Sequence, residues 1–119
     1  MTNISLVASD VMRIVTLALD ATTLRQQVAA SNIANAGIAG FQRSQVSFEE
    51  QLRGVAARLD LSPAGMAALR PRVVNDPGPV SLDQDVTAMA GNAIHYQTLL
   101  KALNAELDLI GVAASDGRR

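Results

Sequence analysis

Residues 82–114 read LDQDVTAMAGNAIHYQTLLKALNAELDLIGVAA and carry the most regular pattern in the chain. Apolar side chains recur there at alternating steps of four and three residues, which is the spacing of a coiled-coil stripe. We call this stripe the seam, and it comprises Leu82, Val86, Met89, Ala93, Tyr96, Leu100, Leu103, Leu107 and Ile110. The pattern predicts one long helix whose stripe is covered by other helices. An ordinary amphipathic helix of a bundle is the alternative that periodicity leaves open.

The start of this helix is marked by polar residues. Ser81 is suited to cap the first free N–H groups, and Gln84 follows at the spacing of a capping box. Asp83 and Asp85 place negative charge at the positive end of the helix dipole. We therefore expect a C-terminal helix over residues 81–112.

A second long helix is predicted over residues 4–35, which contain no proline and are dense in aliphatic side chains. Two apolar stripes run along it, although Asp10 and Ser31 interrupt the first. The first comprises Val7, Ile14, Leu17, Ala21, Leu24 and Val28, and the second comprises Val11, Met12, Val15, Ala18 and Leu19. One partner helix would leave part of this surface exposed. Additional subunits, or the middle of the chain folded back, are the two possible covers.

The middle of the chain has a different composition, because all four prolines lie between residues 37 and 80. We expect a short extended stretch over residues 41–48 and a short amphipathic helix over residues 49–61. Residues 62–79 contain few core-forming groups and resemble a flexible surface connection that tolerates change.

These patterns divide the chain into three parts: an N-terminal helix over 1–36, an irregular middle over 37–80 and a C-terminal helix over 81–119. The predicted fold class is mainly α. Two long terminal helices form a coiled-coil-like hairpin that packs between subunits, and the middle segment is irregular and partly extended.

Bulk composition agrees with a small helical protein. The chain has 119 residues, 49% of them hydrophobic and only 3% aromatic, so its apolar mass is aliphatic and suits helix packing better than a β-sandwich. The formal net charge is −1 and no long basic run occurs, which argues against nucleic acid as a partner. We expect protein partners and self-association.

Residues capable of catalysis or metal binding are sparse. The chain has no cysteine and one histidine, His95, which has no second histidine to complete a metal set. Close acidic pairs include Asp83 with Asp85 and Glu49 with Glu50; we expect the first pair to point apart on a helix and the second to be solvated. We therefore expect no enzyme activity, cofactor, metal or small-molecule substrate.

The apolar start of the chain does not fit a targeting or membrane segment. No basic residue precedes Arg13, and Asp10 and Asp20 bracket the apolar run between them. A cleaved signal peptide needs a basic start, and a spanning helix needs about 20 apolar residues. Neither is expected here.

Residues 29–41 read AASNIANAGIAGF and hold a helix end followed by a turn. Asparagine side chains can bind freed carbonyls or neighbouring helices, and Gly40 permits a backbone turn that other residues resist. The stretch resembles the signature of flagellar rod, hook and hook-associated proteins. The matching residues are Ser31, Asn32, Ala34, Asn35, Gly40 and Phe41. Ile38 and Ala39 stand where that family has Thr-Pro, and Phe41 stands where it has Tyr.

Within this family, three further segments are similar to the proximal rod proteins, namely residues 46–52, 80–83 and 92–97. Two neighbouring kinds of proximal rod protein resemble the chain, and residues 92–97 favour one of them. The resemblance implies a structural subunit of the bacterial flagellar basal body that transmits torque through helical assembly. A soluble helical adaptor, which binds one partner through the seam, is the alternative from another class.

The resemblance also implies a location and partners. The subunit would leave the cell interior through the flagellar type III export apparatus, without a cleaved signal peptide, and join the rod that spans the periplasm. Its partners would be other flagellar rod subunits, the MS-ring adaptor FliE and export-gate proteins.

Overall fold

A computed structural model describes residues 2–58 and 62–117 of the chain, with side chains described from residue 9 onward. The molecule is elongated, with extents of 64 × 28 × 16 Å. Its elements in chain order are α1 (Thr2–Ala34), β1 (Ser44–Ser47), α2 (Glu49–Arg58), α3 (Pro63–Ala68), β2 (Arg72–Asn75) and α4 (Leu82–Asp116). The mainly α fold class, with two long terminal helices in contact and a partly extended middle, is confirmed. No helix in the described part of the chain is long and apolar enough to cross a bilayer.

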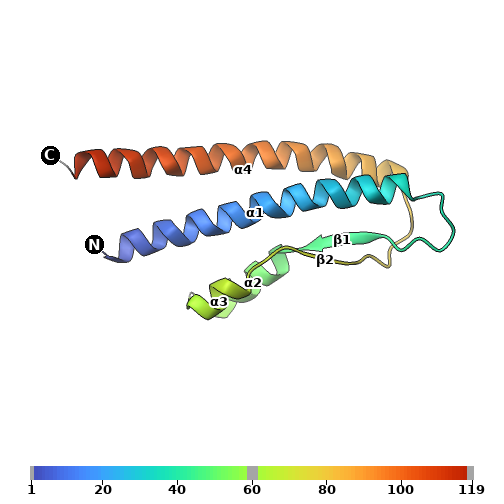
Figure 1. The fold of residues 1–119 in the computed structure, drawn as a ribbon, viewed down its shortest axis with the longest axis horizontal. Coiled ribbons are helices and arrows are strands. Elements are labelled where there is room, and N and C mark those ends of the chain that lie inside the picture. Colours follow the sequence, from blue (N-terminus) through green and yellow to red (C-terminus); the bar gives the residue numbers. More distant parts are fainter. Residues whose placement is uncertain (1, 59–61, 118–119) are drawn as a thin grey trace.

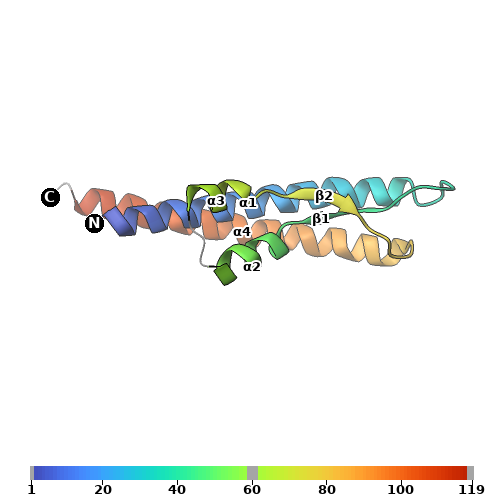
Figure 2. The same ribbon diagram turned by 90° about the horizontal axis from the view of Figure 1, so that it is seen from below.

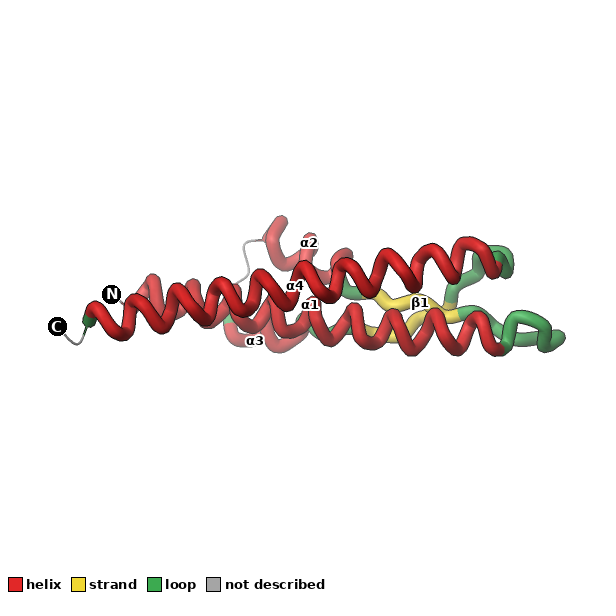
Figure 3. The backbone as a smooth tube through the Cα atoms, turned by 90° about the horizontal axis from the view of Figure 1, so that it is seen from above, coloured by secondary structure: helices red, strands yellow, loops and turns green. Residues whose placement is uncertain are grey.

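The elements form layers on either side of α1 (Figure 1). Helix α4 runs antiparallel along one side of α1, whereas the two strands, α2 and α3 lie on the other side. Figure 2 gives the same arrangement from below, with both chain ends at one end of the molecule and the turns at the other. In Figure 3 the two long helices separate toward the turns, and the strands lie in line with the gap between them.

The strands β1 and β2 form an antiparallel ladder in which Ser44 pairs with Asn75 and Ser47 pairs with Arg72. The extended stretch expected over residues 41–48 is therefore present as β1. Helix α2 begins at Glu49 as expected and is described to Arg58. The remainder of the helix expected over 49–61 lies outside the described residues.

The apolar core lies between α1 and the folded-back middle segment. Val55 of α2 packs with Met66 and Leu69, and Ile14 and Leu17 of α1 pack against this cluster together with Leu52. The middle segment thus covers one stripe of α1, which is the second of the two covers considered from the sequence. Val7 of the first stripe lies outside the described side chains.

The expectation that residues 62–79 form a flexible surface connection with few core-forming groups is wrong for residues 62–69. Pro63 occupies the first turn of α3, where its missing N–H costs nothing, and the Ser62 hydroxyl accepts a hydrogen bond from the Gly65 N–H at 3.1 Å. Met66 and Leu69 are then one helical turn apart and both are buried. Proline and glycine here start a short helix and do not mark a loose connection.

The predicted start of α4 is confirmed. Ser81 caps the helix, its hydroxyl accepts from the Gln84 N–H, and Asp83 and Asp85 lie in the first turn. The helix continues to Asp116, beyond the expected end at residue 112. At 35 residues it has about 50 Å of surface to cover, and its main contact is α1.

Candidate functional site

The motif residues form the end of α1 and the turn after it. The Asn35 side chain donates to the Ser31 carbonyl at 2.8 Å, but this oxygen also accepts the Asn35 N–H at 3.0 Å and so is not a carbonyl freed at the helix end. The turn closes through a hydrogen bond from the Phe41 N–H to the Ile38 carbonyl, 3.2 Å long. Gly40 has a φ of +80° within it, a conformation that side-chain-bearing residues adopt at a cost. Ala34 is exposed and Phe41 is half-buried.

Asn32 joins this helix end to the first strand. Its side chain is buried, with 4% exposure, and its amide pairs with both backbone groups of Ser44. The Ser44 N–H donates to Asn32 Oδ1 at 3.1 Å, and Asn32 Nδ2 donates to the Ser44 carbonyl at 2.9 Å. The amide therefore satisfies the N–H and the carbonyl of Ser44, as the backbone of a neighbouring strand would, and fixes β1 against α1. The sequence suggested a carbonyl or helix partner for Asn32 and did not identify the strand.

Arg43 joins three segments that are distant in the chain. Its guanidinium donates to the Pro79 carbonyl at 2.9 Å, lies 3.3 Å from an Asp76 carboxylate oxygen and pairs with Asp85 of α4. The side chains of Arg43 and Asp85 are 12% and 7% exposed, so this pair is almost fully desolvated. One side chain thus holds both ends of the middle segment and the start of α4.

The two buried polar atoms without partners in the described part of the chain are Arg43 Nε and Asp85 Oδ2, and they belong to this same pair. Sequence reasoning assigned Asp85 only to the helix dipole and did not single out Arg43. No short-range pattern links them, because they are 42 residues apart.

Arg25 fixes the other end of β1. It donates to the Val46 carbonyl at 3.2 Å and forms a two-pronged pair with Glu49 at the start of α2. The hydrogen bond from Arg25 lowers the pKa of Glu49 below its ordinary value, while partial burial opposes the shift. The Glu49 side chain is half exposed, so water screens part of this attraction.

Polar groups also bind α4 to α1. Asn92 donates to the Thr22 carbonyl at 2.6 Å and to the Gln26 side-chain oxygen at 2.9 Å. Thr22 itself is buried, as is Ala21 beside it. The long helices therefore have a fixed register near the middle of the molecule.

Only part of the seam faces α1. Met89 and Leu103 are half-buried, and they alternate with Asn92 and Leu99 along the contacting face of α4. The other seven seam residues are more exposed than these two. They are Leu82, Val86, Ala93, Tyr96, Leu100, Leu107 and Ile110, all exposed. The six large side chains among them are 39% to 55% exposed, which leaves an apolar stripe along α4 with no cover within the subunit.

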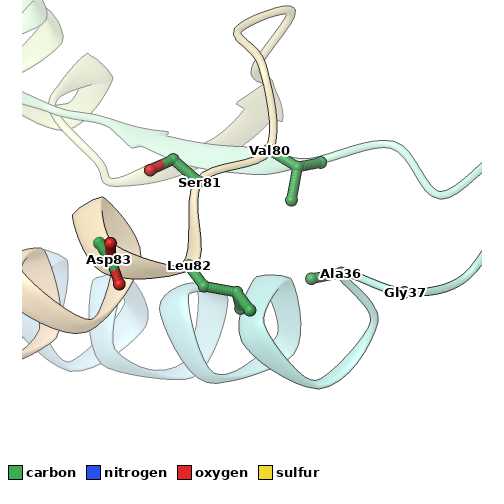
Figure 4. Close-up of a pocket in the computed structure, with 6 residues that line it drawn as sticks. All are labelled: Ala36, Gly37, Val80, Ser81, Leu82 and Asp83. Carbon is green, nitrogen blue, oxygen red and sulfur yellow. The ribbon is translucent and has the colours of Figure 1, made fainter.

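One concave region is lined by the polar side chains described above, among them Asn32, Arg43, Asp76, Asp85 and Asn92. Figure 4 shows another, between the motif turn and the start of α4, where Leu82 points toward Ala36. Ser81 and Asp83 supply its polar side chains and lie apart. His95 is exposed on α4. Within residues 2–58 and 62–117, no group of three acidic or histidine residues is placed to hold a metal ion.

Comparison with known proteins agrees with the motif. No family model matches the chain. A flagellar basal body rod protein FlgB from Yersinia enterocolitica is 29% identical over 113 aligned residues, which cover 76% of this chain and 82% of the relative. FlgB from Yersinia ruckeri is 28% identical over the same lengths and shares. The resemblance to flagellar rod proteins is confirmed by these two relatives.

Proposed function

We propose that this chain, a relative of the flagellar basal body rod proteins, is a structural subunit of the proximal rod of FlgB type. Rod subunits work by packing, so the relevant surface is one that other subunits can cover. The neighbouring proximal rod protein FlgC is the alternative within the family. An adaptor that binds one partner through the seam is the alternative outside it.

The observation that carries this proposal is the exposed part of the seam on α4. Its large side chains are about half exposed in the subunit, and covering them contributes roughly 1 kcal/mol each. A stripe that is repeated every seven residues along 35 residues of helix suits a long helical partner. Such a contact, repeated in every subunit, would hold a tube together under load.

The polar contacts around the strands support a role in torque transmission. Asn32, Arg25 and Arg43 attach β1 to α1, α2 and α4 through buried or half-buried hydrogen bonds. A subunit with its middle segment fixed to both long helices turns as one body. Torque would then pass through the packed helices. In this proposal the chain has two assembly helices, residues 1–36 and 81–119, and residues 37–80 hold them in a fixed arrangement.

The partners follow from the same assignment. Other rod subunits, the MS-ring adaptor FliE and export-gate proteins would contact the terminal helices in the basal body. The motif residues Ser31, Asn32, Ala34, Asn35, Gly40 and Phe41 would set the turn from which the strand returns along α1. Delivery would use the flagellar type III apparatus.

The test is genetic and structural. Deleting the gene in its own host should abolish swimming, and a plasmid copy should restore it. Purified basal bodies from the complemented strain should contain the chain, whereas those from the deletion strain should lack a rod. Cells that swim without the gene, or complete basal bodies that lack the chain, would refute the assignment.

A further inference from the structure

The two sides of the molecule carry opposite charge. On α4 the exposed charged side chains are three carboxylates, of Asp83, Asp108 and Asp116, against one ammonium, of Lys101. On the other side of α1 (Figure 1), apart from Glu50 and from Glu49, which pairs with Arg25, the middle segment exposes four guanidinium groups. These belong to Arg53, Arg58, Arg70 and Arg72. None of these eight side chains forms an ion pair within the described residues, so their charges remain available to a partner.

Apolar side chains accompany the charges on both sides. Strand β2 is exposed at all four residues, and Val73 and Val74 are 51% and 38% exposed beside Arg72. It is also an edge strand, because the sheet has only two strands and β1 occupies its other edge. On α4, Leu107 is exposed next to Asp108. Each side therefore combines an exposed apolar strip with an excess of one charge, acidic on α4 and basic on the middle segment.

We propose that the exposed face of α4 in one subunit packs against the α2, α3 and β2 face of a second copy of this chain. This inference rests on the proposed function and names the contact that would build the assembly. Packing α4 against another α4 would place carboxylates opposite carboxylates, and packing two middle segments together would place arginines opposite arginines. Opposite potentials select the mixed contact over both.

A contact of this kind would produce an open assembly, to which further subunits can add. A contact between two different faces is heterologous, so each subunit keeps one free face of each kind after pairing. The α4 face and the middle-segment face lie on opposite sides of α1, and repetition of the contact adds subunits without closing a pair (Figure 1). A helical or ring-like array follows.

Cross-linking tests the contact directly, because the chain has no cysteine and single thiols can be introduced without background. One set of variants carries a cysteine on α4, as Val86→Cys, Leu100→Cys or Leu107→Cys. The other carries Val73→Cys on β2, and Gln42→Cys at the motif turn serves as the collision control. After mixing and mild oxidation of the full-length chains, we expect one or more α4 variants to cross-link to Val73→Cys roughly tenfold more than to Gln42→Cys.

Charge reversal gives the matched control. Asp83→Lys with Asp108→Lys makes both faces basic. Arg53→Glu with Arg72→Glu leaves the middle segment with Arg58 and Arg70 against two new carboxylates and Glu50, so that chain has no basic face. Each doubly reversed chain alone should lose the α4-to-β2 cross-link, and a mixture of the two should recover it. All four positions are exposed, so circular dichroism should find each variant folded.

Three results would overturn the proposal. They are a dominant cross-link between two α4 thiols, no cross-link above the Gln42→Cys control, and α4-to-β2 cross-links that charge reversal leaves unchanged. None of them bears on whether the chain is a rod subunit, because deletion and complementation decide that separately.

Discussion

Replacing Leu107 by aspartate should separate folding of the subunit from its assembly. Leu107 is 46% exposed in the subunit, so folding already buries only about half of its side chain. Fully burying a leucine contributes roughly 1.5–3 kcal/mol, and losing half of that costs the isolated fold about 1 kcal/mol. The introduced carboxylate stays in water, so no charge is buried in the free subunit.

In the assembly the same change is far more costly. Covering the exposed half of Leu107 contributes about 1 kcal/mol per contact, and a buried carboxylate without a partner costs about 3–5 kcal/mol. The sum, on the order of 5 kcal/mol, corresponds to a loss of more than about a thousandfold in association at each contact. Every subunit of the array repeats the penalty.

The assay measures secretion, basal bodies and swimming in the same cells. We expect Leu107→Asp to be exported at near-normal levels and to unfold at nearly the wild-type temperature, while the cells lack completed rods. Lys101→Asp, on the same helix and also exposed, is the matched control and should be mild. Leu103→Asp should instead destabilise the isolated subunit by about 2–4 kcal/mol, because Leu103 is half-buried on the face toward α1.

Normal swimming with Leu107→Asp would show that the exposed part of the seam is not an assembly surface. Equal damage from Lys101→Asp would point to a general effect of negative charge on α4. Equal loss of thermal stability from Leu103→Asp and Leu107→Asp would mean that the two positions are not differently buried, against the structure.

Four further predictions concern the fold that presents this surface. Asn32→Ala should lower the free energy of unfolding by about 1–3 kcal/mol in urea titrations, because it leaves both buried backbone groups at the start of β1 unpaired, and a loss near zero would contradict that role. Arg43→Met should cost about 3–5 kcal/mol by stranding the Asp85 carboxylate, and adding Asp85→Leu should recover most of it; additive losses would show that the two side chains are not coupled. The pKa of Glu49 is lower in the folded state than in the unfolded state, so the stability that Glu49 contributes is complete above its unfolded pKa and is lost as pH falls through its folded pKa. Glu49→Gln should therefore reduce the loss of stability between neutral and acidic pH by up to about 1 kcal/mol, measured by thermal unfolding across that pH range. Leu69→Ala should lower the free energy of unfolding by about 2–5 kcal/mol in urea titrations. An unchanged urea midpoint would show that residues 62–79 contribute no core residue at Leu69.

The sequence alone identified the two long helices and the start of the second one. These features depend on interactions between residues three or four positions apart, such as the Ser81 cap and the spacing of the seam, and such interactions are visible in a linear pattern. The motif around Asn32 was likewise local, although its strand partner was not. Residues 62–79 were misjudged because proline, a strong loop signal, is also favoured in the first turn of a helix, and because the burial of Leu69 depends on α1.

Tertiary structure decided which stripe of α4 meets α1. The less exposed residues of α4 show that α1 packs on one edge of the seam, at Met89 and Leu103, and on the position beside it, which the sequence fills mostly with polar residues. These are Asp85, Asn92, Leu99 and Glu106. Asn92 settles the choice, because its hydrogen bonds to Thr22 and Gln26 turn its own side of the helix toward α1. The ion pair between Arg43 and Asp85 fixes the start of the helix in the same orientation across 42 residues of chain. No local pattern encodes either contact, and together they leave most of the seam exposed.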